Sequence, residues 1–336
     1  MRTLEFVVAD ALVPTDFAPE VLRDLSLPHL SVLASHALDG LPHPGETAQA
    51  RTEVPLLTAW QGWLLRHQTH ANLAAWWAQA LHFEAPPAVP WLWMLEPAHF
   101  QVGHDRVMLG DPRSLTLSSD EGEELAAAAR PVLNEAGWTL FAVTPERWFV
   151  ARSDAQTLCG PALECGIGRN VALWMPYGDA AAALGWRRVM NEIQMTWFVH
   201  PVNESREAAG LNVINGAWLS GTGQLNVPHL PFAKVASSLK FLRHVPTEAN
   251  ATIDLETFDG LIEPARSQDW SAWRNAVQGL DLRASELLGV LREGTYDTLE
   301  CAFTGETGVR RWSVRRTDLW KFWRRGHAAE LFAEST

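Results

Sequence analysis

The stretch WRRVMNEIQMTWFVHPVNESREAAGLNVINGAWLSGTG, residues 186–223, holds the densest run of polar residues among apolar ones in the chain. Val189, Ile193 and Trp197 follow one another at intervals of four residues, and this spacing predicts one apolar face of a helix. The helix should end before Pro201, because proline disfavours a helical residue before it. A break in the chain is therefore expected inside the stretch.

The second half of the stretch is expected to form a helix, a strand and a turn in that order. Pro201 suits the first position of a short helix over residues 202–209, and Gly210 would end that helix. Residues 215–219 then favour a short strand, followed by a glycine turn at residues 221–223.

Polar side chains of this stretch fall at the predicted breaks and ends or beside the apolar helix face, where they can converge on a ligand. The candidate ligand-binding residues are Arg187, Arg188, Asn191, His200, Asn203, Arg206 and Asn215. A guanidinium suits a phosphate because it can bond two of its oxygens at once. In the alternative interpretation, the Asn and His side chains cap helices and Arg206 lies in solvent.

The overall composition is that of a globular protein, with 336 residues of which 47% are hydrophobic and 20% are charged. This length allows two domains, or one domain with a large insertion. The formal net charge of -12 argues against nucleic acid or an anionic membrane as the main partner, because both need a basic face. A small anionic ligand remains compatible, since a pocket with a few arginines suffices.

Other features indicate the compartment. The apolar run near the N-terminus is interrupted by Asp10, unlike a signal peptide, and no apolar run reaches membrane-spanning length. We therefore expect a cytoplasmic protein.

Cys159, Cys165 and Cys301 form no CxxC pair and are expected to be reduced core residues. The 17 tryptophans are expected to be apolar anchors in helix packing.

Strands and helices alternate along the chain on both sides of a segment, roughly residues 100–200, that has its own strand–helix–strand pattern. Residues 4–9 favour a strand with Asp10 at its C-terminal end, where open α/β sheets bind ligands and metals. Residues 91–95 favour a strand or a buried connection. The other expected elements are helices at 27–34, 54–81, 118–135, 232–242 and 271–291, and strands at 107–109, 115–117, 138–143, 147–150, 251–255, 298–303 and 309–314.

The polar stretch also resembles a known family. His200-Pro201-Val202-Asn203, followed by Arg206, Gly210 and the glycines of residues 221–223, resembles a signature of the archaeal-type, cofactor-independent phosphoglycerate mutases. Residues 213–215 read Val-Ile-Asn where that family has Pro-Ala-Asn. Together with the preceding NEIQM sequence, the stretch looks more closely like proteobacterial phosphoglycerate-mutase-like proteins of the RpfE regulatory type. The resemblance is specific over about forty residues.

Fainter matches follow the family's order along the rest of the chain. Residues 6–10 stand where the superfamily has its first strand and a metal-binding aspartate. The resemblance therefore implies an α/β fold, with an alkaline-phosphatase-like core sheet flanked by helices and built from residues 1–99 and 216–336. Residues 100–215 would form an inserted α+β subdomain that ends in the HPVN segment.

The chemistry of the active family does not carry over. That family holds two divalent metals, commonly Mn or Zn, and carries the phosphoryl group on a serine. Between residues 39 and 65 this sequence has no serine, and its only hydroxyls are Thr47, Thr52 and Thr58. The expected Asp-His ligand pairs after residue 223 are absent from the sequence. The remaining candidate metal ligands are Asp10, Asp254, Asp259 and His229.

Three hypotheses follow. The favoured one is a phosphoglycerate-mutase-like protein without its metal site and nucleophile, which needs no cofactor and acts as a regulatory or ligand-binding module for a small anionic metabolite or a protein partner. The second is an active metal-dependent phosphoglycerate mutase or phosphatase that binds two divalent metals through the four candidate ligands. The third is a purely structural or interaction protein, in which the polar cluster only ties the domains together.

Overall fold

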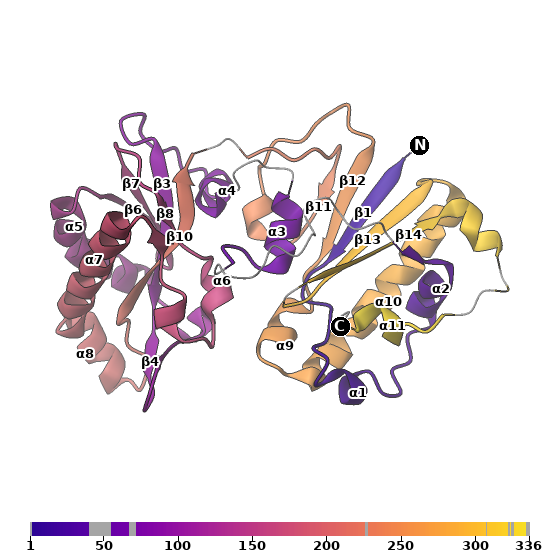
Figure 1. Ribbon diagram of the computed structural model, residues 1–336, viewed down its shortest axis with the longest axis horizontal. Coiled ribbons are helices and arrows are strands. Elements are labelled where there is room, and N and C mark those ends of the chain that lie inside the picture. The colour runs from indigo at the N-terminus through magenta and orange to yellow at the C-terminus, as the bar shows by residue number, and fades with distance from the viewer. Residues whose placement is uncertain are drawn as a thin grey trace. The chain divides into compact units, whose positions relative to one another are not determined.

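The chain folds into two compact units (Figure 1). The computed structural model describes residues 2–39, 55–66, 72–225, 228–306, 308–321, 323 and 326–333. The terminal unit contains both ends of the chain and comprises Met1–Ala50, Ala59–His67 and His229–Thr336. The inserted unit comprises Arg51–Thr58 and Gln68–Pro228.

A mixed sheet of six strands forms the centre of the terminal unit. Its order is β11 (Val235–Ala236), β12 (Ile253–Phe258), β1 (Thr3–Val8), β13 (Thr298–Thr304), β14 (Val309–Arg315) and β2 (Leu38–Asp39). The first four strands are parallel, and β14 and β2 continue the sheet in antiparallel pairing. The predicted strands at 4–9, 251–255, 298–303 and 309–314 are confirmed as β1, β12, β13 and β14.

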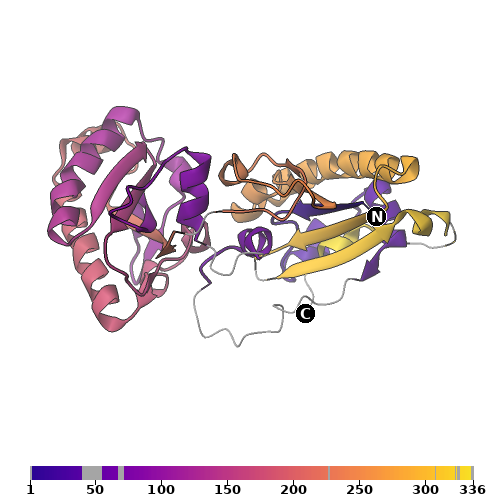
Figure 2. The ribbon, with the colours of Figure 1, turned by 90° about the horizontal axis from the view of Figure 1, so that it is seen from above.

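Helices cover the two faces of this sheet. They are α1 (Ala18–Val21), α2 (Pro28–His36), α3 (Ala59–Leu65), α9 (Ile262–Arg266), α10 (Trp270–Glu293) and α11 (Ala329–Phe332), with 3-10 turns η3 (Lys240–Leu242) and η4 (Arg316–Trp320). The stripe of α10 that includes Trp273, Val277 and Leu280 is buried in one core with Phe6 and Val8 of β1. Figure 2 shows α10 running along one face of the sheet.

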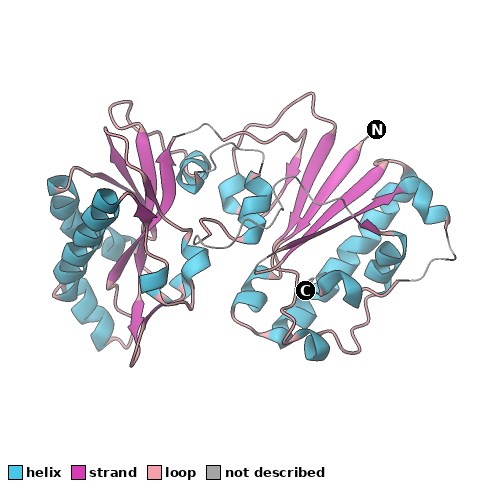
Figure 3. Cartoon of the chain, viewed as in Figure 1, coloured by secondary structure: helices cyan, strands magenta, loops and turns pink. Residues whose placement is uncertain are grey.

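An antiparallel sheet of four strands forms the centre of the inserted unit (Figure 3). Its order is β10 (Gly216–Gln224), β3 (Trp91–Ala98), β7 (Arg147–Arg152) and β6 (Thr139–Thr144). Two small ribbons accompany it, β4 (Phe100–Val102) with β5 (Val107–Leu109), and β8 (Leu158–Cys159) with β9 (Tyr177–Gly178). The predicted hairpin at 138–143 and 147–150 is confirmed as β6 and β7.

The helices of the inserted unit begin where local signals predict. They are α4 (Leu73–Ala80), α5 (Ser119–Glu135), α6 (Leu163–Gly166), α7 (Ala180–Phe198) and α8 (Pro201–Ala208), with 3-10 turns η1 (Pro112–Ser114) and η2 (Val171–Leu173). Ser118 and Glu121 form a reciprocal capping box at the start of α5. Proline is the first residue of α8, as expected.

Tryptophans anchor both cores. In the inserted unit, the Trp138 ring meets Trp93 and Trp186 edge to face at centroid distances of 5.0 and 5.5 Å. Trp320 and Trp323 are exceptions, because 80% and 68% of their surfaces are exposed. The prediction that tryptophans are packing anchors is therefore wrong for these two residues. None of the described helices is long and apolar enough to cross a membrane.

The structure differs from the predicted elements at several places. Residues 232–242 contain β11 and a short 3-10 turn instead of a helix, and residues 115–117 form no strand. The predicted helix at 54–81 is divided between α3 and α4 within the described residues. Residues 221–223 belong to β10, where the pairing with β3 shifts register, instead of forming a turn.

The unit boundaries also differ from the predicted ones. The sequence placed residues 91–99 and 216–224 in the core, but β3 and β10 pair with each other and with β7 in the sheet of the inserted unit. The inserted unit therefore extends beyond the predicted range of 100–215. Antiparallel partners more than a hundred residues apart leave no local signal of this pairing in the sequence.

The register shift in β10 depends on glycine at position 223. Gly223 has a positive φ of 78°, and a Cβ at this position would lie 2.2 Å from the ring of Trp93, which is fully buried. Both the backbone conformation and the packing exclude a larger residue.

We expect Gly223→Ala to lower the free energy of unfolding by about 2 kcal/mol. Gly185→Ala is the matched control, because Gly185 lies in α7, where an added Cβ would meet no atom within 4 Å. That change should raise stability by up to about 1 kcal/mol, since alanine is the better helix former. Urea unfolding of both variants checks this, and a Gly223→Ala variant as stable as the wild type would contradict it.

Candidate functional site

The predicted ligand-binding residues lie on α7, on α8 and its N-cap, and directly before β10, but the structure does not bring all of them together. Arg187, Arg188 and Asn191 are exposed on α7. His200 is the N-cap of α8, where its Nδ1 accepts a hydrogen bond from the Val202 backbone N–H at 3.3 Å. This is the capping role of the alternative interpretation.

Asn203 is buried and satisfies backbone groups on both sides of it. Its Nδ2 donates to the carbonyls of Trp197 and Ile214, both at 2.8 Å. Its Oδ1 accepts from the Ile214 N–H at 2.7 Å. The amide therefore bonds Ile214 as a neighbouring strand would, and ties the irregular segment before β10 to the end of α7.

Arg206 is 1% exposed and holds three segments of the inserted unit together. Its Nε donates to the Asn212 carbonyl at 2.8 Å, its Nη1 donates to Glu121 at 2.9 Å, and its Nη2 donates to the Leu115 carbonyl. Partial burial alone would raise the pKa of Glu121, but hydrogen bonds from Ser118 and Arg206 outweigh it and lower that pKa. The alternative interpretation, in which Arg206 lies in solvent, is wrong.

Asn215 completes this set of internal contacts. Its Oδ1 accepts from the Phe100 N–H at 2.6 Å, and its Nδ2 donates to the Phe100 carbonyl at 3.0 Å. Asn203, Arg206 and Asn215 thus use their polar groups on the backbone and on Glu121 within one unit. The arrangement supports a structural role for these three residues, and Arg187, Arg188 and Asn191 lie apart from them on the surface.

We expect Asn203→Ala to lower the free energy of unfolding by about 3 kcal/mol, because it leaves buried backbone groups of Trp197 and Ile214 without partners. Glu207→Ala is the control and should stay within about 0.5 kcal/mol of the wild type, since its side chain is exposed on the same helix. Denaturant unfolding measures both. A stable Asn203→Ala protein that had lost affinity for a phosphoglycerate would instead favour the ligand-binding role.

The edge of the terminal sheet where parallel strands end is the second candidate site. Asp10 and Asp259 follow the neighbouring strands β1 and β12 at this edge. Asp10 has a positive φ of 51°, and its backbone N–H donates to Thr304 Oγ1 at 3.0 Å. The Arg266 Nε lies 3.5 Å from Asp10 Oδ2, so a guanidinium stands beside this carboxylate.

The other two candidate metal ligands lie elsewhere in the terminal unit. Asp254 pairs in register with Leu4, four residues before the end of β1, which places it about 13 Å along the strands from the edge. It accepts hydrogen bonds from Arg2 at 3.0 Å and from Tyr296 at 2.8 Å. The Nε2 atom of His229 lies 3.5 Å from Oε1 of Glu248. The described residues contain no group of three or more His, Cys, Asp or Glu side chains that could hold a metal ion.

A buried carboxylate that sequence reasoning missed lies in the inserted unit. Glu96 of β3 is 3% exposed, and Arg147 donates to its Oε1 at 2.7 and 3.2 Å. The same guanidinium lies over the Trp77 ring, 3.6 Å from the centroid. Ser220 Oγ donates to Glu96 Oε2 at 3.4 Å. A lone glutamate inside the apolar sequence WLWMLEPA was the signal that could have found it.

Burial is the largest influence on Glu96. It raises the pKa of this carboxyl, and Arg147 only partly offsets the effect. The folded-state pKa of Glu96 thus lies above its unfolded-state pKa. Its contribution to the free energy of unfolding is complete below the ordinary glutamate pKa of about 4.3, and it is lost as pH rises through the folded-state pKa. The pair ties β3 to β7 and has the character of a structural ion pair.

Glu96→Gln should therefore gain stability relative to the wild type as pH rises from about 4.3 toward neutrality, since the amide need not be ionised in the core. The exposed Glu123→Gln is the control and should show a smaller change with pH. Urea unfolding across this pH range measures the difference. An advantage of the wild type that grew with pH would show that Arg147 outweighs the cost of burial.

Comparisons with known proteins support the fold. No family model matches the chain, and no curated protein matches it. Among solved structures, the PH0037 protein from Pyrococcus horikoshii is similar over 98% of this chain and 91% of its own, with a TM-score of 0.53 and 12% sequence identity. A cofactor-independent phosphoglycerate mutase from Thermoplasma acidophilum DSM 1728 is similar over 93% of this chain and 89% of its own, with a TM-score of 0.42 and 14% identity.

These findings define the class of protein. It is an α/β protein with a parallel-rich, mixed central sheet flanked by helices, and the predicted fold class is confirmed. The likeness to the Pyrococcus horikoshii protein concerns the fold alone and extends over nearly the whole chain.

Proposed function

We propose that this chain is a phosphoglycerate-mutase-like protein of the RpfE type that acts as a binding or regulatory module and not as a two-metal phosphomutase. The HPVN signature and its order along the chain support the family assignment. The fold that the chain shares with a solved structure over nearly its full length is compatible with it.

The contact between Arg266 and Asp10 is the observation that carries this proposal. Asp10 stands where the resemblance places the first metal-binding aspartate, at the sheet edge where ligands of α/β proteins bind. A guanidinium 3.5 Å from its carboxylate supplies a positive charge from the protein itself. A divalent ion on the same carboxylate would be repelled by that charge.

The rest of the sheet edge does not fit a pair of metal ions either. Two-metal catalysis needs several carboxylates or imidazoles around two ions a few ångströms apart. Asp254 is held by Tyr296 about 13 Å along the strands from this edge, His229 pairs with Glu248, and Asp259 follows β12 next to Asp10. Of the candidate hydroxyl nucleophiles, Thr47 and Thr52 lie outside the described residues.

A binding or regulatory role needs a ligand or a partner. A small anionic metabolite and a protein partner both suit an acidic protein with a few exposed arginines, and Arg187 and Arg188 are such residues. A purely structural protein is the remaining alternative. A structural role is favoured for three of the predicted residues by their internal contacts, namely Asn203, Arg206 and Asn215. These contacts do not involve the exposed arginines.

Metal analysis and an activity assay on the full chain test the proposal together. After dialysis against Mn or Zn and removal of free ions, we expect no stoichiometric metal and no interconversion of 3-phosphoglycerate and 2-phosphoglycerate. About two metals per chain together with turnover would overturn the proposal in favour of an active phosphomutase. Arg266→Gln is a useful companion variant, because metal that bound only after removal of this guanidinium would identify Arg266 as the group that keeps the ion away.

A further inference from the structure

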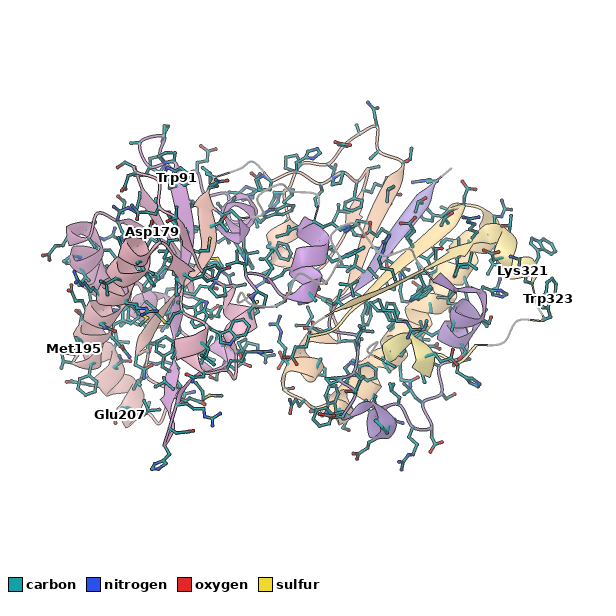
Figure 4. The ribbon with its side chains drawn as sticks, viewed as in Figure 1. Trp91, Asp179, Met195, Glu207, Lys321 and Trp323 are labelled. Atoms are coloured by element: carbon teal, nitrogen blue, oxygen red, sulfur yellow. The ribbon has the colours of Figure 1, made fainter. Side chains whose placement is uncertain are left out.

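Helix α7 is apolar on two opposite faces. Trp186, Val189, Ile193 and Trp197 form the inner face and are buried in the core of the inserted unit. On the outer face, Leu184, Met195 and Phe198 are 51%, 75% and 78% exposed. Figure 4 shows Met195 projecting outward from α7.

The outer residues form one continuous stripe. Positions 184, 188, 191, 195 and 198 alternate in steps of four and three, the spacing of residues that face a second helix in a two-helix contact. At about 100° per residue, all five lie within about 80° of one another around the helix, opposite the buried face. We define the outer stripe as Leu184, Arg188, Asn191, Met195 and Phe198. Three large apolar side chains in one such line favour burial against a partner.

The order of residues in the stripe is self-complementary. Leu184 and Phe198 each lie seven residues from Asn191, so a twofold axis through Asn191 would place each Leu184 opposite Phe198 of the other helix. Arg188 lies three residues before Asn191, and the exposed Glu192 lies one residue after it on the same flank. In an antiparallel pair, Arg188 and Glu192 of different copies would therefore differ by only about 3 Å along the axis.

We propose that the outer stripe of α7 pairs with the same stripe of a second copy of this chain, the two helices running antiparallel about a twofold axis at Asn191. Leu184 packs on Phe198 at both ends, Met195 packs on the aliphatic stem of Arg188 between them, and the two Asn191 side chains meet at the centre. Two symmetry-related Arg188–Glu192 ion pairs flank the apolar contacts. Charge complementarity thus selects a second copy as the partner.

The local charge of this face supports self-association in a protein whose formal net charge is -12. Two such chains repel each other, but Arg187 and Arg188 outnumber Glu192 on this part of α7, so the contact lies where the repulsion is weaker. An interface of one helix per copy is small, and the dimer should therefore be weak and dependent on concentration. This inference does not rest on the proposed function and would hold for an enzyme as well.

Sedimentation velocity of the full chain over a concentration series tests the proposal. The wild type should change reversibly from the mass of one chain to twice that mass. Phe198→Glu should raise the dissociation constant at least about tenfold, because it places a carboxylate against Leu184. Leu282→Glu, on the exposed surface of α10, is the matched control and should leave the dimer unchanged.

A charge exchange tests the register. Arg188→Glu and Glu192→Arg should each weaken the dimer, since like charges would then meet across the axis, and the double variant should recover most of the loss. The affected side chains are exposed, so circular dichroism should show an unchanged fold. A wild type that stayed monomeric at every concentration, a dimer insensitive to Phe198→Glu, or a double variant no better than the single ones would each overturn the proposal.

Discussion

The parallel pairing of β1 with both β12 and β13 is the constraint on which the terminal unit depends. Thr3 lies opposite Ile253 on one side and Thr298 on the other, so the first strand finds its neighbours near the other end of the chain. Closing the sheet commits the N-terminal part and the last third of the sequence to one fold. Most of the residues between them, Gln68–Pro228, fold as a unit with its own sheet and its own core.

Burial of this central strand brings a charge into the terminal unit that the fold must balance. Glu5 lies within β1 and is 4% exposed, and Arg66 donates to both of its carboxylate oxygens at 2.7 Å. The Trp63 indole donates to the same carboxylate at 2.8 Å. Helix α3, which carries Trp63, thus lies on the face of β1 opposite Phe6 and is fixed there by a buried ion pair that would be costly to leave incomplete.

In the inserted unit, buried polar side chains satisfy the backbone hydrogen-bonding groups of an irregular segment, as a neighbouring strand does in a sheet. The chain between α8 and β10 has no regular structure, and Asn203 and Arg206 satisfy its backbone groups instead. Residues that read in sequence as a ligand site are thereby part of the scaffold. Arg187, Arg188 and Asn191 stay exposed on α7, and Arg188 and Asn191 belong to its outer stripe.

The sequence by itself determined most of the local elements of this protein. Apolar periodicity, capping residues and prolines predicted α5, α7, α8 and α10, and alternating or continuous apolar runs predicted β1, β6, β7, β13 and β14, because these signals act between residues a few positions apart. The sequence also placed Asp10 at the end of β1.

Only the tertiary structure decided which strands share a sheet and which polar groups are buried. The pairing of β3 with β10, the approach of Arg266 to Asp10 and the enclosure of Arg206 by segments up to 91 residues away all join positions distant in the chain. A side chain's charge is fixed by its identity. Whether it contacts a ligand or hydrogen-bonds other parts of the same chain depends on which backbone groups the fold brings within hydrogen-bonding distance.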